Sequence, residues 1–194
     1  MNKLMDNLKI ERKTLFSYPL FVFDDINIPN INDHIQMFYD LRKDIPVASV
    51  RSNIGGWQSY FDIHTYPIMN TLVRMIQEVS ISTFGVSCII KDSWVNISGN
   101  QHSNAIHTHG GPTTPFPKHF SGVFYYKVPN NDSPIWFYDP ADINVRVHHN
   151  PKPNQIILFP SHLAHSVDVN TTNEDRISIA FNAENYLRPP EPPK

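Results

Sequence analysis

The sequence is poor in cysteine: Cys88 is the only one, so no disulfide can form within the chain. The first residues are polar and charged, and they lack the apolar segment of a secretory signal peptide. A chain with neither feature is typical of a reducing compartment. We therefore expect this protein to reside in the cytoplasm.

The net charge of the chain is also small. It carries 16 Lys and Arg against 18 Asp and Glu, which gives a formal charge of −2. Such a chain offers no electrostatic case for binding duplex nucleic acid or an anionic membrane. No apolar run approaches the roughly 20 residues that a membrane-spanning helix needs. A protein side chain, a peptidyl proline, a small molecule and a single nucleobase all remain open as the group that is recognised, and both a monomer and a homodimer remain open.

Prolines and aromatic residues are abundant instead, with 17 prolines and 12% aromatics. Helical spacing of apolar side chains predicts one helix between Pro29 and Pro46 and a second over residues 67–84. From residue 86 onward, short alternating segments are separated by turns rich in Gly, Pro, Asn and Asp. Residues 14–23 are predicted to form a single edge strand, because Pro19 removes one backbone donor.

This order of elements favours a mainly β fold. We expect a double-stranded β-helix of the jelly-roll or cupin-like type, with the two N-terminal helices packed on the outside. At 194 residues the chain has the length of one such domain. Within it we expect a supporting region of one strand and two helices (1–85), a jelly-roll catalytic core (86–183) and a proline-rich tail (184–194).

Ten histidines are a high number for this length, and eight of them follow residue 100. His107 and His109 alternate on a predicted strand, so both side chains reach the same side. His165, after a hydrophobic segment, is the best third partner, with His162 as its alternative. Three neutral imidazoles can hold a divalent metal and leave positions open for substrate and water. The alternative is that these are ordinary core or surface histidines.

A second pattern lies downstream, where strict alternation over residues 176–182 puts Arg176 and Ser178 on one face of a strand. An arginine that points into a barrel needs an anionic partner. Its planar guanidinium matches a carboxylate, and the serine hydroxyl can add a hydrogen bond. The alternative is an internal ion pair with Asp139 or Asp175. The phenol of Tyr126 could complete the carboxylate pocket, or it could be an ordinary core aromatic.

Taken together, these motifs resemble the iron(II)- and 2-oxoglutarate-dependent oxygenases. The general pattern of these enzymes is a His-x-acid pair on one strand, a distant His and an Arg-x-Ser about ten residues after it. The resemblance is closer to one family of 2OG-Fe(II) oxygenases from bacteria and phages. It covers roughly residues 50–183 and keeps the order of six segments, which are 52–59, 94–96, 107–109, 121–129, 159–167 and 176–182.

The resemblance implies a dioxygenase that uses Fe(2+), 2-oxoglutarate as cosubstrate and O2, and that hydroxylates an unidentified substrate. If a phage encodes the chain, its compartment is the host cytoplasm. The resemblance also implies roles for single residues. The iron ligands would include His107 and His165, and the cosubstrate would be bound by Arg176, Ser178, Tyr126, Asn96 and Asn182.

His109 departs from the general pattern, because it stands where most of these oxygenases have an acidic ligand. The nearer family is similar to this chain in having a His-x-His. A neutral ligand leaves the iron more positive than a carboxylate would. Other readings therefore stay open: a third ligand from elsewhere, loss of activity, a three-histidine zinc lyase or hydrolase, or a non-catalytic jelly-roll binding module.

Overall fold

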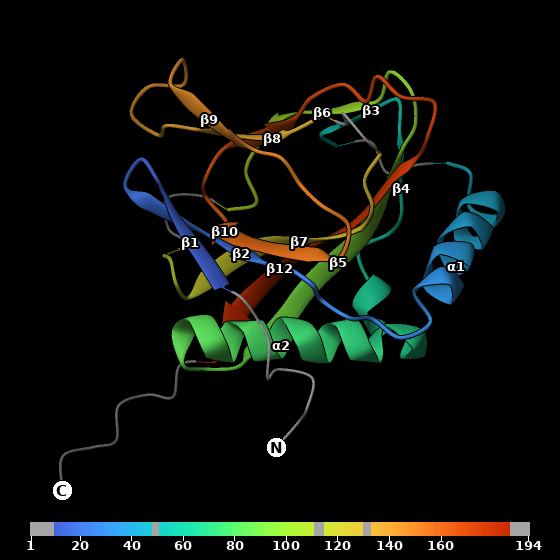
Figure 1. Ribbon diagram of the computed structural model, residues 1–194, viewed down its shortest axis with the longest axis horizontal. Coiled ribbons are helices and arrows are strands. Elements are labelled where there is room, and N and C mark those ends of the chain that lie inside the picture. Colours follow the sequence, from blue (N-terminus) through green and yellow to red (C-terminus); the bar gives the residue numbers. More distant parts are fainter. Residues whose placement is uncertain (1–9, 48–50, 111–114, 130–132, 187–194) are drawn as a thin grey trace, which may run out of the picture.

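Two antiparallel sheets face each other in the computed structural model, which describes residues 10–47, 51–110, 115–129 and 133–186 (Figure 1). The seven-stranded sheet has the order β1-β2-β10-β7-β12-β5-β4, and the five-stranded sheet has the order β3-β6-β11-β8-β9. The strands are β1 (Ile10–Leu15), β2 (Tyr18–Phe23), β3 (Asn53–Ile54), β4 (Trp57–Gln58), β5 (Cys88–Ser98), β6 (Ser103–His107), β7 (His119–Lys127), β8 (Ile135–Tyr138), β9 (Arg146–His149), β10 (Gln155–Pro160), β11 (His165–Val167) and β12 (Arg176–Asn185).

The expectation of a mainly β fold with antiparallel sheets is confirmed. Two α-helices occur in the described residues, α1 (Ile31–Asp44) and α2 (Asn70–Phe84), and two short 3-10 turns precede α2 at Ile63–Thr65 and Pro67–Met69. Figure 1 shows α2 lying across the outer face of the larger sheet and α1 standing at its side. No helix in the described part of the chain is long and apolar enough to cross a membrane.

Both helices form where apolar residues recur at helical spacing. The second helix ends at Gly85, whose φ of 74° is the left-handed conformation in which glycine commonly ends a helix. The predicted tail (184–194) begins too early, because β12 continues to Asn185, and residues 187–194 lie outside the described residues.

The single strand predicted for residues 14–23 is wrong. The structure has a hairpin instead, in which β1 pairs with β2 from Ile10↔Phe23 to Leu15↔Tyr18. The turn between the strands holds Phe16 at a φ of 59°. Glycine and asparagine are the residues that usually adopt this conformation and so mark a turn in a sequence. Phenylalanine rarely does, so the sequence gives no signal for this turn. Because β2 also pairs with β10, Pro19 lies in an inner strand rather than at the edge.

Two hydrophobic layers hold the domain together. The outer layer lies between the larger sheet and the helices, where Phe38, Val79, Phe124 and Phe181 are among the buried residues. The inner layer lies between the sheets and includes Trp94, Tyr125 and Phe159. Strands of the larger sheet are therefore buried on both faces, as β7 and β10 are along nearly their whole length.

Gly122 lies in the middle of β7, where a side chain has no room. A Cβ there would lie 2.7 Å from the carbonyl oxygen of Ile157 and would also clash with the ring of Phe181. We expect Gly122→Ala to lower the free energy of unfolding by about 1–3 kcal/mol, the usual cost of overpacking. Urea denaturation checks this. The control is Gly85→Asn, a position with open space around it, and an equal loss in both variants would contradict the argument.

Candidate metal centre

Three histidines from separate parts of the chain meet in one cluster. His107, the last residue of β6, pairs across the smaller sheet with His165, the first residue of β11. His109 lies beyond the end of β6, where its backbone N–H donates a hydrogen bond to the Ser161 carbonyl at 2.8 Å. One ligand nitrogen of each ring lies within 4.8 Å of the other two. This group can hold a metal ion.

Hydrogen bonds to the backbone select which nitrogen of two rings is free. Nδ1–H of His107 donates to the Ala105 carbonyl at 2.8 Å, and Nδ1–H of His165 donates to the Leu163 carbonyl at 2.9 Å. In each ring Nε2 then keeps its lone pair. Nε2 of His165 lies 3.2 Å from Nε2 of His109. Two imidazole nitrogens this close together could hold one metal ion.

Burial keeps the three imidazoles neutral. Desolvation lowers the pKa of His107, and it lowers the pKa of His109 to about 3, with a smaller contribution from the neighbouring His107, since two adjacent imidazoles resist protonation together. The pKa of His165 is lowered well below its ordinary value, first by desolvation and then by the two neighbouring histidines. Since a metal ligand must be deprotonated, the cluster is ready to bind a cation at neutral pH.

Without metal, the protein is expected to lose stability as the pH falls below about 6.5. The unfolded chain protonates histidines near their ordinary pKa of about 6.5, whereas the folded chain keeps these three neutral. The unfolded state then binds more protons, so the free energy of unfolding decreases as the pH is lowered. The contribution of His109 to this decrease is complete near pH 3. Denaturant titrations between about pH 5 and 8 check this. His109→Asn should flatten the slope, and an unchanged slope would refute the assignment.

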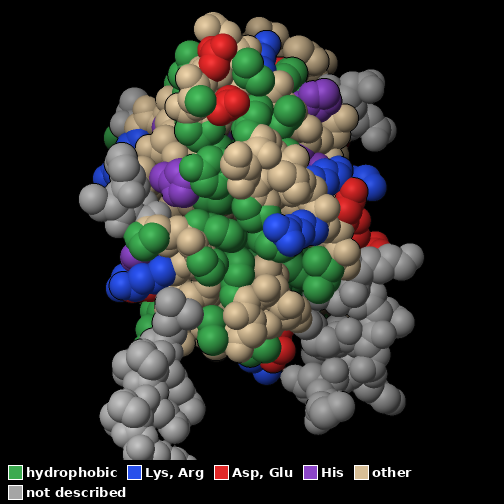
Figure 2. Space-filling view, turned by 90° about the vertical axis from the view of Figure 1, so that its left-hand side faces the viewer, with side chains coloured by type: hydrophobic (Ala, Val, Ile, Leu, Met, Phe, Trp, Pro, Cys, Tyr) green, Lys and Arg blue, Asp and Glu red, His purple; other side chains and the backbone are tan. Residues whose placement is uncertain are grey.

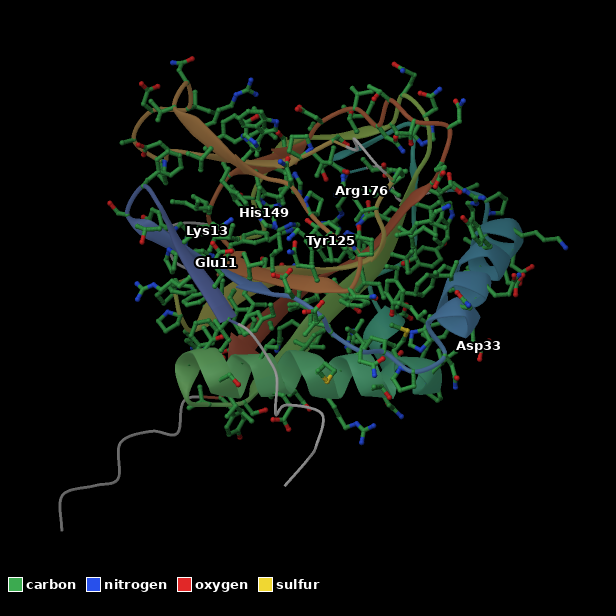
Figure 3. The ribbon with its side chains drawn as sticks, in the orientation of Figure 1. Glu11, Lys13, Asp33, Tyr125, His149 and Arg176 are labelled. Atoms are coloured by element: carbon green, nitrogen blue, oxygen red, sulfur yellow. The ribbon has the colours of Figure 1, made fainter. Side chains whose placement is uncertain are left out.

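A pocket extends from the histidines to the start of β12. It is lined by His107, His109 and His165 and also by Arg176, Ser178 and Asn96. Arg176 and Ser178 are only 5% and 4% exposed. Figure 3 shows Arg176 and Tyr125 in the space between the sheets, and the guanidinium carbon lies 5.5 Å from the centre of the Tyr125 ring. The structure thus brings the predicted metal ligands and the predicted anion-binding arginine to one pocket.

Asn96 belongs to the same pocket. It is the cross-strand partner of Ser178 in the pairing of β5 with β12. Its Oδ1 is buried and has no hydrogen-bond partner among the described residues. A half-turn of the amide would present Nδ2 at the same place, so Asn96 can either accept or donate a hydrogen bond there. An orphaned polar atom of this kind indicates a site for a polar ligand.

The prediction that the Tyr126 phenol completes the carboxylate pocket is wrong. Its ring packs against Phe38 in the outer layer, and its hydroxyl lies 2.9 Å from Nδ1 of His34. Burial raises the pKa of this phenol, and no charged partner offsets the shift. A bulge between β7 and β12 places Tyr125 opposite Ser178, so Tyr125 faces the pocket instead.

Asn182 is also displaced from its predicted position. It shares the inner face of β12 with Arg176, but six residues of strand separate them by about 20 Å. Asn182 lines a neighbouring pocket, where its Nδ2 donates to Asp92 at 2.6 Å. On its other side, the Ser121 hydroxyl donates to Oδ1 of Asn182 at 2.7 Å and lies 2.9 Å from the Ser161 hydroxyl. Asn182 therefore supports the segment whose Ser161 carbonyl anchors His109.

Two further residues lie at the site, in the segments 52–59 and 94–96, although the sequence predicted no individual role for either. Ser52 places its hydroxyl 3.3 Å from Nε2 of His107 and lines both pockets, and Trp94 packs its ring 5.2 Å from that of His109. Neither has a chemical signature of its own in the sequence. His162 is not the third member of the cluster, because its ring packs edge-on against Tyr18. Asp175 is not the ion-pair partner predicted as an alternative for Arg176, because it contacts Tyr39 and Arg42 instead.

Comparison with protein families gives a match of sequence. Residues 92–182 match a family described as "Putative 2OG-Fe(II) oxygenase". The matched region contains the three histidines and Arg176. Comparison with curated proteins gives no match.

Solved structures share the fold at low sequence identity. The α-ketoglutarate-dependent carbocyclase SnoK of nogalamycin biosynthesis has a TM-score of 0.68 at 9% identity, over 85% of this chain and 79% of SnoK. HygX from Streptomyces hygroscopicus, solved with nickel, 2-oxoglutarate and hygromycin B, has a TM-score of 0.64 at 9% identity, over 87% and 83%. A Pseudomonas putida prolyl-4-hydroxylase has a TM-score of 0.61 at 9% identity, over 89% and 95%.

The jelly roll thus carries its three-histidine pocket within a region that is similar to non-haem oxygenases of the iron and 2-oxoglutarate type. Residues 92–182 are the part of the chain that carries this similarity.

Proposed function

We propose that this protein is an Fe(II)- and 2-oxoglutarate-dependent hydroxylase whose iron is held by His107, His109 and His165. The observation that carries the proposal is the common pocket, because one cavity joins three neutral imidazoles to a buried arginine. A metal site alone fits many functions. The arginine beside it gives the pocket a place for an anionic cosubstrate.

The residues of the pocket fit a metal ion and 2-oxoglutarate. Three imidazole nitrogens suit a first-row divalent metal and leave its remaining positions open. Arg176 and Ser178 offer a guanidinium and a hydroxyl from one face of β12, as a carboxylate requires. Asn96 adds a polar atom that has no partner among the described residues.

Each part of the pocket has a distinct task. The carbonyls of Ala105 and Leu163 hold the Nδ1 protons of two imidazoles and so keep Nε2 of each ring directed at the metal. Arg176 and Ser178 orient the distal carboxylate of 2-oxoglutarate. Trp94 and Tyr125 line the pocket and restrict the entry of water.

When bound, iron supplies the oxidation chemistry: 2-oxoglutarate, O2 and a substrate C–H bond give succinate, CO2 and the hydroxylated substrate. The chain contributes binding, orientation and a dry environment.

Anaerobic Fe(II) titration with and without 2-oxoglutarate tests the proposal. Binding of both together should give a visible absorption band that neither gives alone, and aerobic incubation should release succinate. Iron binding without cosubstrate binding would exclude the oxygenase. Water activation by Zn²⁺ on three histidines would then become the better reading, or a non-catalytic module if zinc gave no activity.

His109→Asp tests the third ligand. If His109 binds the metal, aspartate at this place should retain the affinity for Fe(II) within about tenfold, since a carboxylate is also a ligand for this metal. His109→Ala should lose at least about a hundredfold, because removal of groups that only support a ligand already costs about 10–100-fold. Competition with a chromophoric chelator measures both. Wild-type affinity in His109→Ala would require a different third ligand.

We also propose the following about the surroundings of the site. The chain acts as one domain, in which α1 and α2 support the jelly roll from outside, and it works in the cytoplasm on a small molecule or a protein. Figure 2 shows hydrophobic side chains gathered in a band down one face. This band supports a homodimer, because large apolar patches commonly mark interaction sites. Sedimentation at several concentrations would test that state.

A further inference from the structure

A second pocket borders the metal-binding histidines. It shares His107 and His109 with the pocket of Arg176. Its own walls come from Arg51, Phe61 and Asp92. A molecule in this second pocket would lie against the same two histidines, whereas Arg176 lines only the first pocket. This is where a substrate must lie if Arg176 holds the cosubstrate.

Asp92 gives the second pocket a half-buried negative charge. Burial raises the pKa of this carboxyl, and the hydrogen bond from Asn182 opposes the rise only in part. Among the described residues, no Lys, Arg or His nitrogen lies close enough to form an ion pair with Asp92. The five ion pairs that these residues form all involve other acids. A carboxylate so placed gains from a cationic ligand.

Arg51 gives the same pocket a positive charge. Its guanidinium carbon lies 4.7 Å from the centre of the Phe61 ring, and Phe61 packs edge-on against Trp94 at 5.4 Å. The arginine is thus held over an aromatic wall. Its charge is near enough to lower the pKa of Asp92, yet the two groups form no ion pair in the described structure. Both charges therefore stay available to a ligand between them.

We propose that the second pocket binds the primary substrate and that this substrate is a small zwitterion, such as a free α-amino acid. Its ammonium group contacts Asp92 and its carboxylate contacts Arg51. The side chain then lies along Phe61 and Trp94 towards the histidines. This inference rests on the proposed oxygenase function and adds the chemical class of its substrate.

Titration calorimetry tests the inference on protein loaded with Zn²⁺ and 2-oxoglutarate, a combination that does not turn over. The probes are the common amino acids, and then the N-acetyl and amide derivatives of the one that binds best. We expect an amino acid to bind the wild type and each derivative to bind at least about tenfold more weakly, because each loses one charge-assisted hydrogen bond.

Variants then assign each contact. Asp92→Asn should lower the affinity for the amino acid at least about tenfold and should leave the affinity for its N-acetyl derivative unchanged. Arg51→Gln should likewise lower the affinity for the amino acid and leave the affinity for its amide derivative unchanged. Lys118→Gln is the matched control, since Lys118 pairs with Glu184 at 3.4 Å and is not among the residues that line the second pocket. It should bind like the wild type.

Three results would overturn the inference. One is that no common amino acid binds protein that does bind metal and 2-oxoglutarate, which leaves the oxygenase function intact. Another is that Asp92→Asn and Arg51→Gln both bind the amino acid as tightly as the wild type. The last is that the wild type fails to bind 2-oxoglutarate, which would remove the proposed function as well.

Discussion

Replacing His165 with alanine is expected to abolish metal binding and, with it, succinate release. Its Nε2 is 3.2 Å from that of His109, and its Nδ1 is bound to the Leu163 carbonyl, so no other atom of this ring can serve as the ligand. Loss of one imidazole leaves two ligands in the cluster. The affinity for Fe(II) should fall at least about a hundredfold, since weakening the support of a ligand alone costs about 10–100-fold.

His162→Ala is the matched control for this prediction. His162 lies three residues earlier, and its ring contacts Tyr18 rather than the cluster. Its removal should leave the affinity for Fe(II) unchanged. Thermal unfolding of both variants separates loss of the ligand from loss of the fold, since His165 is also buried in the core. A folded His165→Ala protein with wild-type metal affinity would rule out the three-histidine centre.

Part of this site could be read from the sequence because short-range geometry determines it. His107 and His109 are separated by one residue, and alternation along an extended chain brings both to one side. Arg176 and Ser178 follow the same rule on β12. His165 needed more than spacing, because its approach depends on the pairing of β11 with β6, which joins residues more than fifty positions apart.

Tyr126 shows where this rule fails. Strand β7 is buried along nearly its whole length, with the helices on one side and the smaller sheet on the other. No polar alternation therefore marks which face looks inward. The bulge opposite β12 then decides that Tyr125 meets Ser178. A bulge of this kind has no fixed sequence signal when neither residue is glycine.

For the fold as well, elements that depend on local sequence were predicted, and elements that depend on pairing between distant residues were not. Helices α1 and α2 carry a local period and form close to their predicted positions, whereas β3 and β4 are two residues long and exist only through pairing with β6 and β5. The hairpin of β1 and β2 was missed because Phe16 occupies a turn position without a turn-forming side chain. Distant pairing, not local preference, fixes these elements.

Replacing Arg176 with alanine is expected to abolish 2-oxoglutarate binding while leaving metal binding intact. The guanidinium is buried against Tyr125 at the far end of the pocket from the histidines. Truncating one member of a buried charge pair costs about 2–5 kcal/mol, so the dissociation constant for 2-oxoglutarate should rise about 30-fold at the least. Arg176→Lys should fall in between, since it keeps the charge and loses the two-pronged contact.

Calorimetric titration of 2-oxoglutarate into Zn²⁺-loaded protein measures this effect. Arg74→Ala on α2 is the control, because that arginine is bound only to the nearby Thr71 hydroxyl in the described structure. Arg176→Ala should bind Zn²⁺ like the wild type, whereas His165→Ala should bind neither metal nor cosubstrate. This difference separates the ligand cluster from the anion site. Unchanged cosubstrate affinity in Arg176→Ala would mean that Arg176 is structural, and the three histidines would then fit a zinc enzyme better than an oxygenase.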